Sequence, residues 1–259
     1  MHKIAFELGP VTATWYGILV AFGFLAGIWT ASRRGLRSGF QAETIFDLGP
    51  WLLIGAIVGA RGLYVISYWQ EDFAGKPIWE IFKIYHGGIV FYGGLIGASL
   101  ACVIYTQYRK LPLWRVADVL APSIALGSVW GRFGCLMNGC CYGRPTDLPW
   151  AIHFPTDHPT LGGPVHPTEI YDSLLNLVLY LILAWLFRRK KFDGQVFGCF
   201  LIGYAAFRSF VEQFRGDYGP AHYLAGLLTP AQVVSIGIAL AGVLLLLWRS
   251  RPAPTETSS

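Results

Sequence analysis

Three arginines lie inside segments that are otherwise apolar, and they are the strongest chemical signal in the sequence. They are Arg61, Arg132 and Arg208. A charge buried at membrane depth is costly, so each arginine predicts a functional site or a buried partner. Arg208 has Glu212 four residues later, and on a helix these two side chains could simply neutralise each other. The arginines still outnumber the buried acids, which predicts an anionic ligand such as the phosphate of a lipid headgroup.

A single histidine, His86, begins the stretch His-Gly-Gly-Ile-Val-Phe-Tyr-Gly-Gly. Histidine titrates near neutral pH and therefore suits general acid–base catalysis, and the neighbouring glycines permit close backbone approach. A lone histidine at the edge of an apolar segment is more often a hydrogen-bonding residue at an interface. Both roles remain open for His86.

The densest cluster of small and polar residues covers 131–144 and contains Arg132, Asn138 and Gly143. At the end of a predicted helix, these residues could form a phosphate cradle from backbone N–H groups and a guanidinium. Tyr16 lies at the outer edge of the first apolar segment. It is either a headgroup hydrogen-bonding residue or part of an aromatic belt.

Five cysteines fall into two settings. Cys102 and Cys199 lie in apolar segments and are expected to be small packing residues. Cys135, Cys140 and Cys141 lie together at the end of the fourth apolar segment, where a disulfide of Cys135 with either neighbour is the leading structural interpretation. No metal site is predicted from the histidines, which lack a compact ligand spacing: His86, His153, His158 and His166.

The elements that hold these residues are expected to be membrane-spanning helices. Hydrophobic residues make up 54% of the 259 residues and charged residues only 14%, with a mean hydropathy of +0.48. A soluble domain carries nearer a quarter charged residues, so this composition excludes an ordinary water-soluble fold and also a disordered chain. Seven apolar segments are of roughly the length that crosses the hydrocarbon core. They cover residues 16–31, 46–68, 88–105, 116–135, 169–187, 195–214 and 230–248.

Basic residues are unevenly distributed between these segments. Loops on one side carry 12 lysines and arginines, and those on the other side carry five. The positive-inside rule then places the N-terminus outside and the C-terminus in the cytoplasm. The net charge of +5 is therefore an orientation signal rather than the footprint of a nucleic-acid site.

The predicted fold class is an all-α polytopic membrane protein with seven transmembrane helices and a small extracytoplasmic cap. Residues 1–251 are expected to form a single seven-helix membrane domain, with an interfacial arm at 69–85 and an extracytoplasmic cap loop at 136–167. Residues 252–259 are expected to be a disordered tail.

Several sequence blocks, in order along nearly the whole chain, resemble the prolipoprotein diacylglyceryl transferases, bacterial inner-membrane enzymes of seven spans. The blocks are Trp15-Tyr16-Gly17, His86-Gly87-Gly88, Asp118 with Ala121-Pro122, Gly131-Arg132-x-Gly134, His166-Pro167-Thr168-Glu169-Ile170-Tyr171 and Tyr204-x-x-x-Arg208-x-x-x-Glu212-x-x-Arg215. Several independent blocks in one order are far more specific than any single motif.

The family signature is commonly written Gly-Arg-x-Gly-Asn-Phe-x-Asn-x-Glu-x-x-Gly. Its retained members here are Gly131, Arg132, Gly134, Asn138 and Gly143. Cys135 stands where the family has its first asparagine, Leu136 replaces the phenylalanine, and Cys140 replaces the glutamate. This chain thus resembles a divergent member of the family.

The resemblance implies transfer of a diacylglyceryl group from phosphatidylglycerol to the lipobox cysteine thiol of preprolipoproteins, with a thioether formed and glycerol phosphate released. It implies phosphatidylglycerol, preprolipoprotein signal peptides and membrane lipid as partners, no nucleic acid and no cofactor, and a multi-pass location in the bacterial cytoplasmic (inner) membrane. A thiol-redox or lipid-binding membrane protein on the same scaffold, using Cys135, Cys140 and Cys141, is the alternative.

The resemblance also implies roles for individual residues. Arg132 and Arg208 are expected to bind the phosphate, and His86 to act as the base or to stabilise the thiolate. These three are the expected catalytic residues. The expected substrate-binding residues are Tyr16, Asn138, Gly143, Tyr204 and Glu212.

Overall fold

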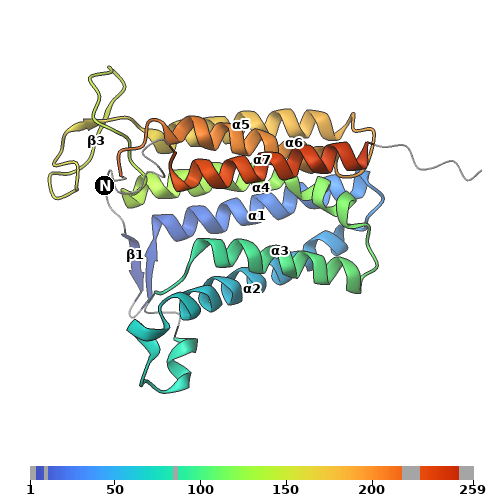
Figure 1. Ribbon diagram of the computed structural model, residues 1–259, viewed down its shortest axis with the longest axis horizontal. Coiled ribbons are helices and arrows are strands. Elements are labelled where there is room, and N and C mark those ends of the chain that lie inside the picture. The colour runs from blue at the N-terminus through green and yellow to red at the C-terminus, as the bar shows by residue number, and fades with distance from the viewer. Residues whose placement is uncertain (1–3, 9–10, 84–86, 218–227, 251–259) are drawn as a thin grey trace, which may run out of the picture. The chain divides into compact units, whose positions relative to one another are not determined.

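A computed structural model describes residues 4–8, 11–83, 87–217 and 228–250 of the chain. Most of these residues are helical, and Figure 1 labels the α-helices α1 to α7. The chain divides into two compact units, one of Met1–Ala31 with Ala117–Ser259 and the other of Ser32–Val116. The predicted tail at 252–259 and His86 both lie outside the described residues.

The first unit holds most of α1 (Trp15–Arg37) and of α4 (Leu113–Asn138), together with α5 (Thr168–Phe187), α6 (Gln195–Glu212) and α7 (Pro230–Arg249). Glycines allow its helices to approach closely. A Cβ atom added to Gly23 of α1 would lie 3.0 Å from the carbonyl oxygen of Gly127 on α4. Small residues at such crossings are typical of helices that pack in lipid.

The second unit is built on α2 (Ala42–Ser67) and α3 (Phe91–Tyr108), which pack along each other. A Cβ atom on Gly59 would overlap the carbonyl oxygen of Gly93, so the two helices meet backbone to backbone. Between them, the predicted arm contains a π-helical turn, η1 (Trp69–Phe73), and a 3-10 turn, η2 (Ile78–Phe82).

In the described residues, two small antiparallel sheets that the prediction did not include accompany the helices. β1 (Ile4–Leu8) pairs with β2 (Val11–Thr14), and β3 (Ile152–His153) pairs with β4 (Pro164–Val165). The first two segments are rich in β-branched and aromatic residues, which favours pairing of strands. The second pair crosses the cap segment, which begins later than residue 136 because α4 continues to Asn138. A small core of Leu136, Phe154 and Val165 holds the cap.

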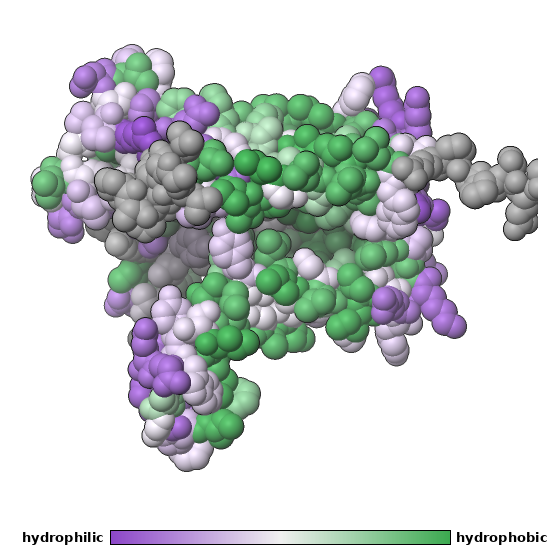
Figure 2. All heavy atoms as spheres, in the orientation of Figure 1, coloured by the Kyte–Doolittle hydropathy of each residue, from purple (hydrophilic) through white to green (hydrophobic). Residues whose placement is uncertain are grey.

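Apolar side chains cover the outside of the helices. Figure 2 shows hydrophobic residues over α5, α6 and α7 of the first unit. Leu181 on α5 is 58% exposed and Leu244 on α7 is 65% exposed. Within the described residues, five helices are long and apolar enough to cross a membrane: α1, α2, α4, α5 and α7. The chain is therefore a mostly helical membrane protein.

A buried carboxylate fixes the start of α6, the helix that carries Arg208. Asp118 on α4 is fully buried, and its Oδ2 atom lies 2.9 Å from Nζ of Lys190 and accepts the N–H of Gly194 at 2.9 Å. Its Oδ1 atom accepts the N–H of Phe197 at 3.0 Å. These N–H groups belong to the first turn of α6, which has no intrahelical acceptors for them. Asp118 thus caps α6 from a neighbouring helix.

Candidate active site

Arg132 on α4 forms an ion pair with Asp172 on α5. Their Nε and Oδ2 atoms lie 2.7 Å apart, and Asp172 is only 3% exposed. The second carboxylate oxygen, Oδ1, accepts a hydrogen bond of 2.7 Å from Nδ2 of Asn176, one turn further along α5. The carboxylate is therefore held on both sides, and it in turn fixes the direction of the guanidinium. Asp172 was absent from the predicted site.

Side chains from three helices converge on Arg132. Both Tyr16 of α1 and Tyr204 of α6 interact electrostatically with it. Gly134 makes room for the first of them, because a Cβ atom there would lie 3.0 Å from Cδ2 of Tyr16. Arg208 lies four residues after Tyr204, on the same face of α6. The structure thus brings together Tyr16, Arg132 and Tyr204.

Arg208 and Glu212 form the pair that their spacing predicts. Nη1 and Oε2 lie 2.6 Å apart, and Glu212 is 2% exposed. The contact is not aligned as a hydrogen bond: among the described residues, neither this Nη1 atom nor either carboxylate oxygen has a hydrogen-bond partner. Buried charges without hydrogen bonds are costly. The pair therefore has bonding capacity that a polar ligand can use.

The loop after α4 departs from the predicted backbone cradle. The N–H of Gly139 donates to Leu136, that of Cys140 to Cys135, that of Gly143 to His166 and that of Arg144 to Phe214. Because these four donors are used inside the protein, the expectation that they hold a phosphate is wrong.

Gly143 and Asn138 occupy this loop in different ways. A Cβ atom on Gly143 would lie 2.5 Å from both Cβ and the carbonyl oxygen of His166, so only glycine fits. Asn138 is exposed at the end of α4, and its side chain hydrogen-bonds the thiol of Cys140. Their predicted contacts with substrate stay predictions.

Two further charged residues at this end, Arg215 and Glu169, belong to the sequence blocks given above but not to the predicted site. Arg215 is 8% exposed and is held by a two-pronged contact with Asp217, while its carbonyl oxygen accepts a hydrogen bond of 3.0 Å from Nε of Arg144. Glu169, in the first turn of α5, is 1% exposed, and its Oε1 atom has no hydrogen-bond partner in the described part of the chain. It interacts electrostatically with Arg132. A carboxylate within an apolar segment was the available signal.

The three neighbouring cysteines are free thiols, so the predicted disulfide is not formed. Their Sγ atoms all lie within 4.8 Å of one another, whereas a disulfide requires about 2.05 Å. Hydrogen bonds with the thiols of Cys135 and Cys140, and then the positive charges of Arg215 and Arg132, lower the pKa of Cys141. The site therefore favours a thiolate at Cys141.

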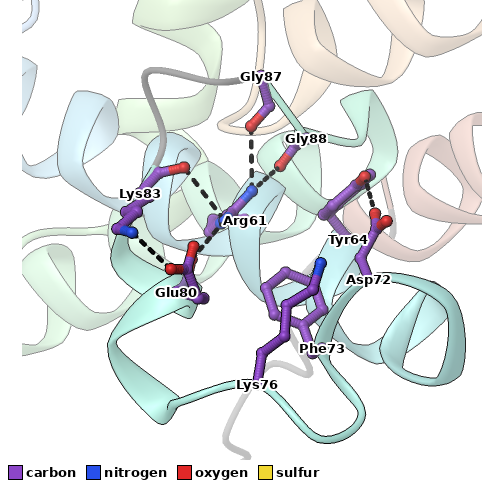
Figure 3. A pocket seen from close by; sticks show the side chains of 9 residues that line it. All are labelled: Arg61, Tyr64, Asp72, Phe73, Lys76, Glu80, Lys83, Gly87 and Gly88. Atoms are coloured by element: carbon purple, nitrogen blue, oxygen red, sulfur yellow. Dashed lines mark hydrogen bonds and ion pairs between the residues drawn. The ribbon is translucent and has the colours of Figure 1, made fainter.

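Arg61 is not the spare buried cation that the sequence predicts. In Figure 3 its guanidinium points into the arm that follows α2. Its nitrogens donate five hydrogen bonds of 2.7 to 3.2 Å, all to backbone carbonyl oxygens: those of Glu80, Ile81, Lys83, Gly87 and Gly88. Since all its donors are directed at the backbone, Arg61 fastens the arm to α2.

Comparison with known proteins supports the resemblance. A family model described as prolipoprotein diacylglyceryl transferase matches residues 3–248. Relatives named phosphatidylglycerol–prolipoprotein diacylglyceryl transferase include proteins of Synechococcus elongatus (41% identity, 93% of this chain and 85% of that protein) and Finegoldia magna (39%, 95% and 94%). A third, from Pseudoalteromonas translucida, is 35% identical over all of this chain and 96% of its own length. This chain belongs to the prolipoprotein diacylglyceryl transferase family.

Proposed function

We propose that this protein transfers the diacylglyceryl group of phosphatidylglycerol to the lipobox cysteine of preprolipoproteins in the bacterial cytoplasmic membrane. The name of its relatives describes this reaction, and the chain covers most of their length. The thiol-redox and lipid-binding alternatives are not favoured, because those relatives all carry the name of the transferase.

The reaction is a substitution at an sp3 carbon. The substrate thiolate forms a bond to the terminal glyceryl carbon, the carbon–oxygen bond to phosphate breaks, and glycerol phosphate leaves with the electron pair. An activated thiolate and a stabilised leaving phosphate are the two requirements. Fixed guanidinium groups meet the second, because they remain charged and donate paired hydrogen bonds to phosphate oxygens.

The observation that carries the proposal is the unfilled bonding capacity of the buried Arg208–Glu212 pair, on the helix whose Tyr204 interacts with the anchored Arg132. Arg132 contacts Asp172 through Nε. Arg208 keeps one terminal nitrogen without an aligned acceptor among the residues described. In this scheme both guanidinium groups bind the phosphate, with Glu212 orienting Arg208.

The remaining predicted residues complete this scheme. Tyr16 and Tyr204 donate hydrogen bonds to the headgroup, and Asn138 and Gly143 shape its outer edge. His86 accepts the thiol proton or stabilises the thiolate. All seven helices span the membrane in this scheme, with the N-terminus outside and the cap on the extracytoplasmic side.

A transfer assay with defined substrates tests the function. The purified protein in phosphatidylglycerol vesicles is given a lipobox peptide, and mass spectrometry follows the peptide and the released glycerol phosphate. Equal amounts of a thioether-linked diacylglyceryl peptide and glycerol phosphate are expected. Vesicles of phosphatidylcholine and a peptide with serine in place of cysteine are the controls. Consumption of the peptide thiol without release of glycerol phosphate would support thiol chemistry instead.

A further inference from the structure

The Sγ atoms of Cys135, Cys140 and Cys141 form a triangle with no side longer than 4.8 Å. Around a tetrahedral metal ion with metal–sulfur bonds near 2.3 Å, thiolate sulfurs lie about 3.8 Å apart. The present triangle therefore needs to close by about 1 Å at most, which small rotations of three side chains provide.

Local structure directs the three thiols to one place. Cys135 lies in the last turn of α4, and its carbonyl oxygen accepts the N–H of Cys140 at 3.1 Å, so the chain folds back on the helix end. Gly139 and Cys141 both have a φ of 71°, in the left-handed region. That region is uncommon for a residue with a side chain. The hydroxyl of Thr168 on α5 donates a hydrogen bond of 2.6 Å to the carbonyl oxygen of Cys141 and so holds the backbone of Cys141 in this conformation.

The surrounding charges suit a complex of thiolates. Arg132 and Arg215 both interact electrostatically with Cys141. Three thiolates with one divalent cation carry a net charge of −1, which neighbouring guanidinium groups stabilise. Thiolate sulfur is a soft ligand that selects d10 ions such as Zn²⁺ over hard cations such as Mg²⁺.

We propose that Cys135, Cys140 and Cys141 bind one thiophilic d10 cation of the Zn²⁺ type, with a fourth position left for water or another donor. Binding forms three metal–sulfur bonds and releases the proton of each neutral thiol. Three protein ligands with an open position are the arrangement of zinc sites that exchange a ligand, whereas four protein ligands mark closed structural sites. This site lies next to the predicted phosphate-binding arginine, yet it does not depend on the proposed transfer reaction.

Metal titration of the reduced, detergent-solubilised protein tests the proposal. Cd²⁺ serves as the spectroscopic probe, because its bonds to thiolate absorb in the near ultraviolet, and Zn²⁺ is the competitor. One Cd²⁺ per chain with a three-thiolate absorption is expected, displaced by Zn²⁺. Bound metal is also expected to protect these three cysteines, identified by mass spectrometry, from alkylation.

Two sets of variants separate the cluster from the other thiols. Cys140→Ser and Cys135→Ser are each expected to weaken Cd²⁺ binding by at least about 100-fold, because loss of a ligand itself costs more than the roughly 10–100-fold lost with a residue that only orients a ligand. The double variant Cys102→Ser with Cys199→Ser is the matched control, and it should bind like the original protein. Circular dichroism checks that each variant is folded. Unchanged binding in folded Cys140→Ser, or alkylation of all three cysteines at saturating metal, would overturn the proposal.

Discussion

The guanidinium of Arg132 and the carboxylate of Asp172 meet across two helices, with Nε and Oδ2 only 2.7 Å apart. The carboxylate side chain is only 4% exposed, whereas the arginine side chain is 21% exposed. Such an arrangement holds a cation in place without neutralising its outer edge. It ties the direction of the Arg132 guanidinium to the packing of α4 against α5.

Replacement of Asp172 with asparagine keeps the shape of the side chain and removes its charge. Arg132 then loses its anchor, and the rate of diacylglyceryl transfer is expected to fall about 100-fold, as is typical when a reacting group is misplaced by about 1 Å. Asp47→Asn is the matched control, because Asp47 is 3.9 Å from Arg109 in an exposed pair worth little. Equal transfer rates for the two variants would show that Asp172 does not position Arg132.

Gly59→Ala tests the backbone contact between α2 and α3. The added methyl group would overlap the carbonyl oxygen of Gly93, and a backbone atom cannot move aside cheaply. A loss of about 1–3 kcal/mol in the free energy of unfolding is expected, measured by denaturant titration in detergent. Gly62→Ala on the same helix meets no described atom within 4 Å, so it should raise stability by up to about 1 kcal/mol. Similar losses in both variants would contradict the close crossing.

Arg61→Lys tests whether Arg61 fastens the arm. Lysine keeps the charge but has three donors, whereas arginine directs five hydrogen bonds at the backbone, three to the arm and two to Gly87 and Gly88. Loss of two hydrogen bonds, each worth about 1 kcal/mol, should increase the population of the open arm more than about tenfold. Limited trypsin digestion is therefore expected to cut faster after Lys76 and Lys83, with Arg109→Lys as the control. Unchanged digestion with a higher KM for phosphatidylglycerol would assign Arg61 to the lipid instead.

The lowered pKa of Cys141 predicts its reactivity. A thiol with a lowered pKa stays ionised when the pH falls below the range in which an ordinary cysteine, at about 8.5, loses its thiolate. Iodoacetamide at about pH 6.5 should therefore modify Cys141 faster than a free cysteine in a reference peptide. Arg215→Gln removes one stabilising charge and should slow this reaction. Peptide mapping that finds Cys141 no faster than the reference would refute the prediction.

Contacts within one helix or one turn could be predicted from the sequence. The Arg208–Glu212 ion pair follows from a spacing of four residues, and the structure confirms it. The nearness of Cys135 to Cys140 and Cys141 follows in the same way. The predicted disulfide was wrong, because a separation of a few residues does not set the distance between two sulfur atoms.

Contacts between distant segments and with the backbone could not be predicted. The partner of Arg132 depends on how α4 and α5 pack, which hydropathy does not specify. Arg61 was counted as an excess charge because a tally of side chains omits carbonyl oxygens, and five of these are its partners. The short strands were missed for a related reason: pairing stabilises β3, which has only two residues and no pattern of its own.

The binding of a lipid phosphate by Arg132 is best examined by measuring transfer from labelled phosphatidylglycerol to a lipobox peptide with Arg132→Ala. Arg109→Ala serves as the control, because Arg109 is an exposed arginine at the end of α3. We expect Arg132→Ala to lose at least about 100-fold in kcat/KM, the effect of removing one charged donor from a developing anion. The control should retain full activity. Full activity in folded Arg132→Ala would show that the phosphate is held elsewhere.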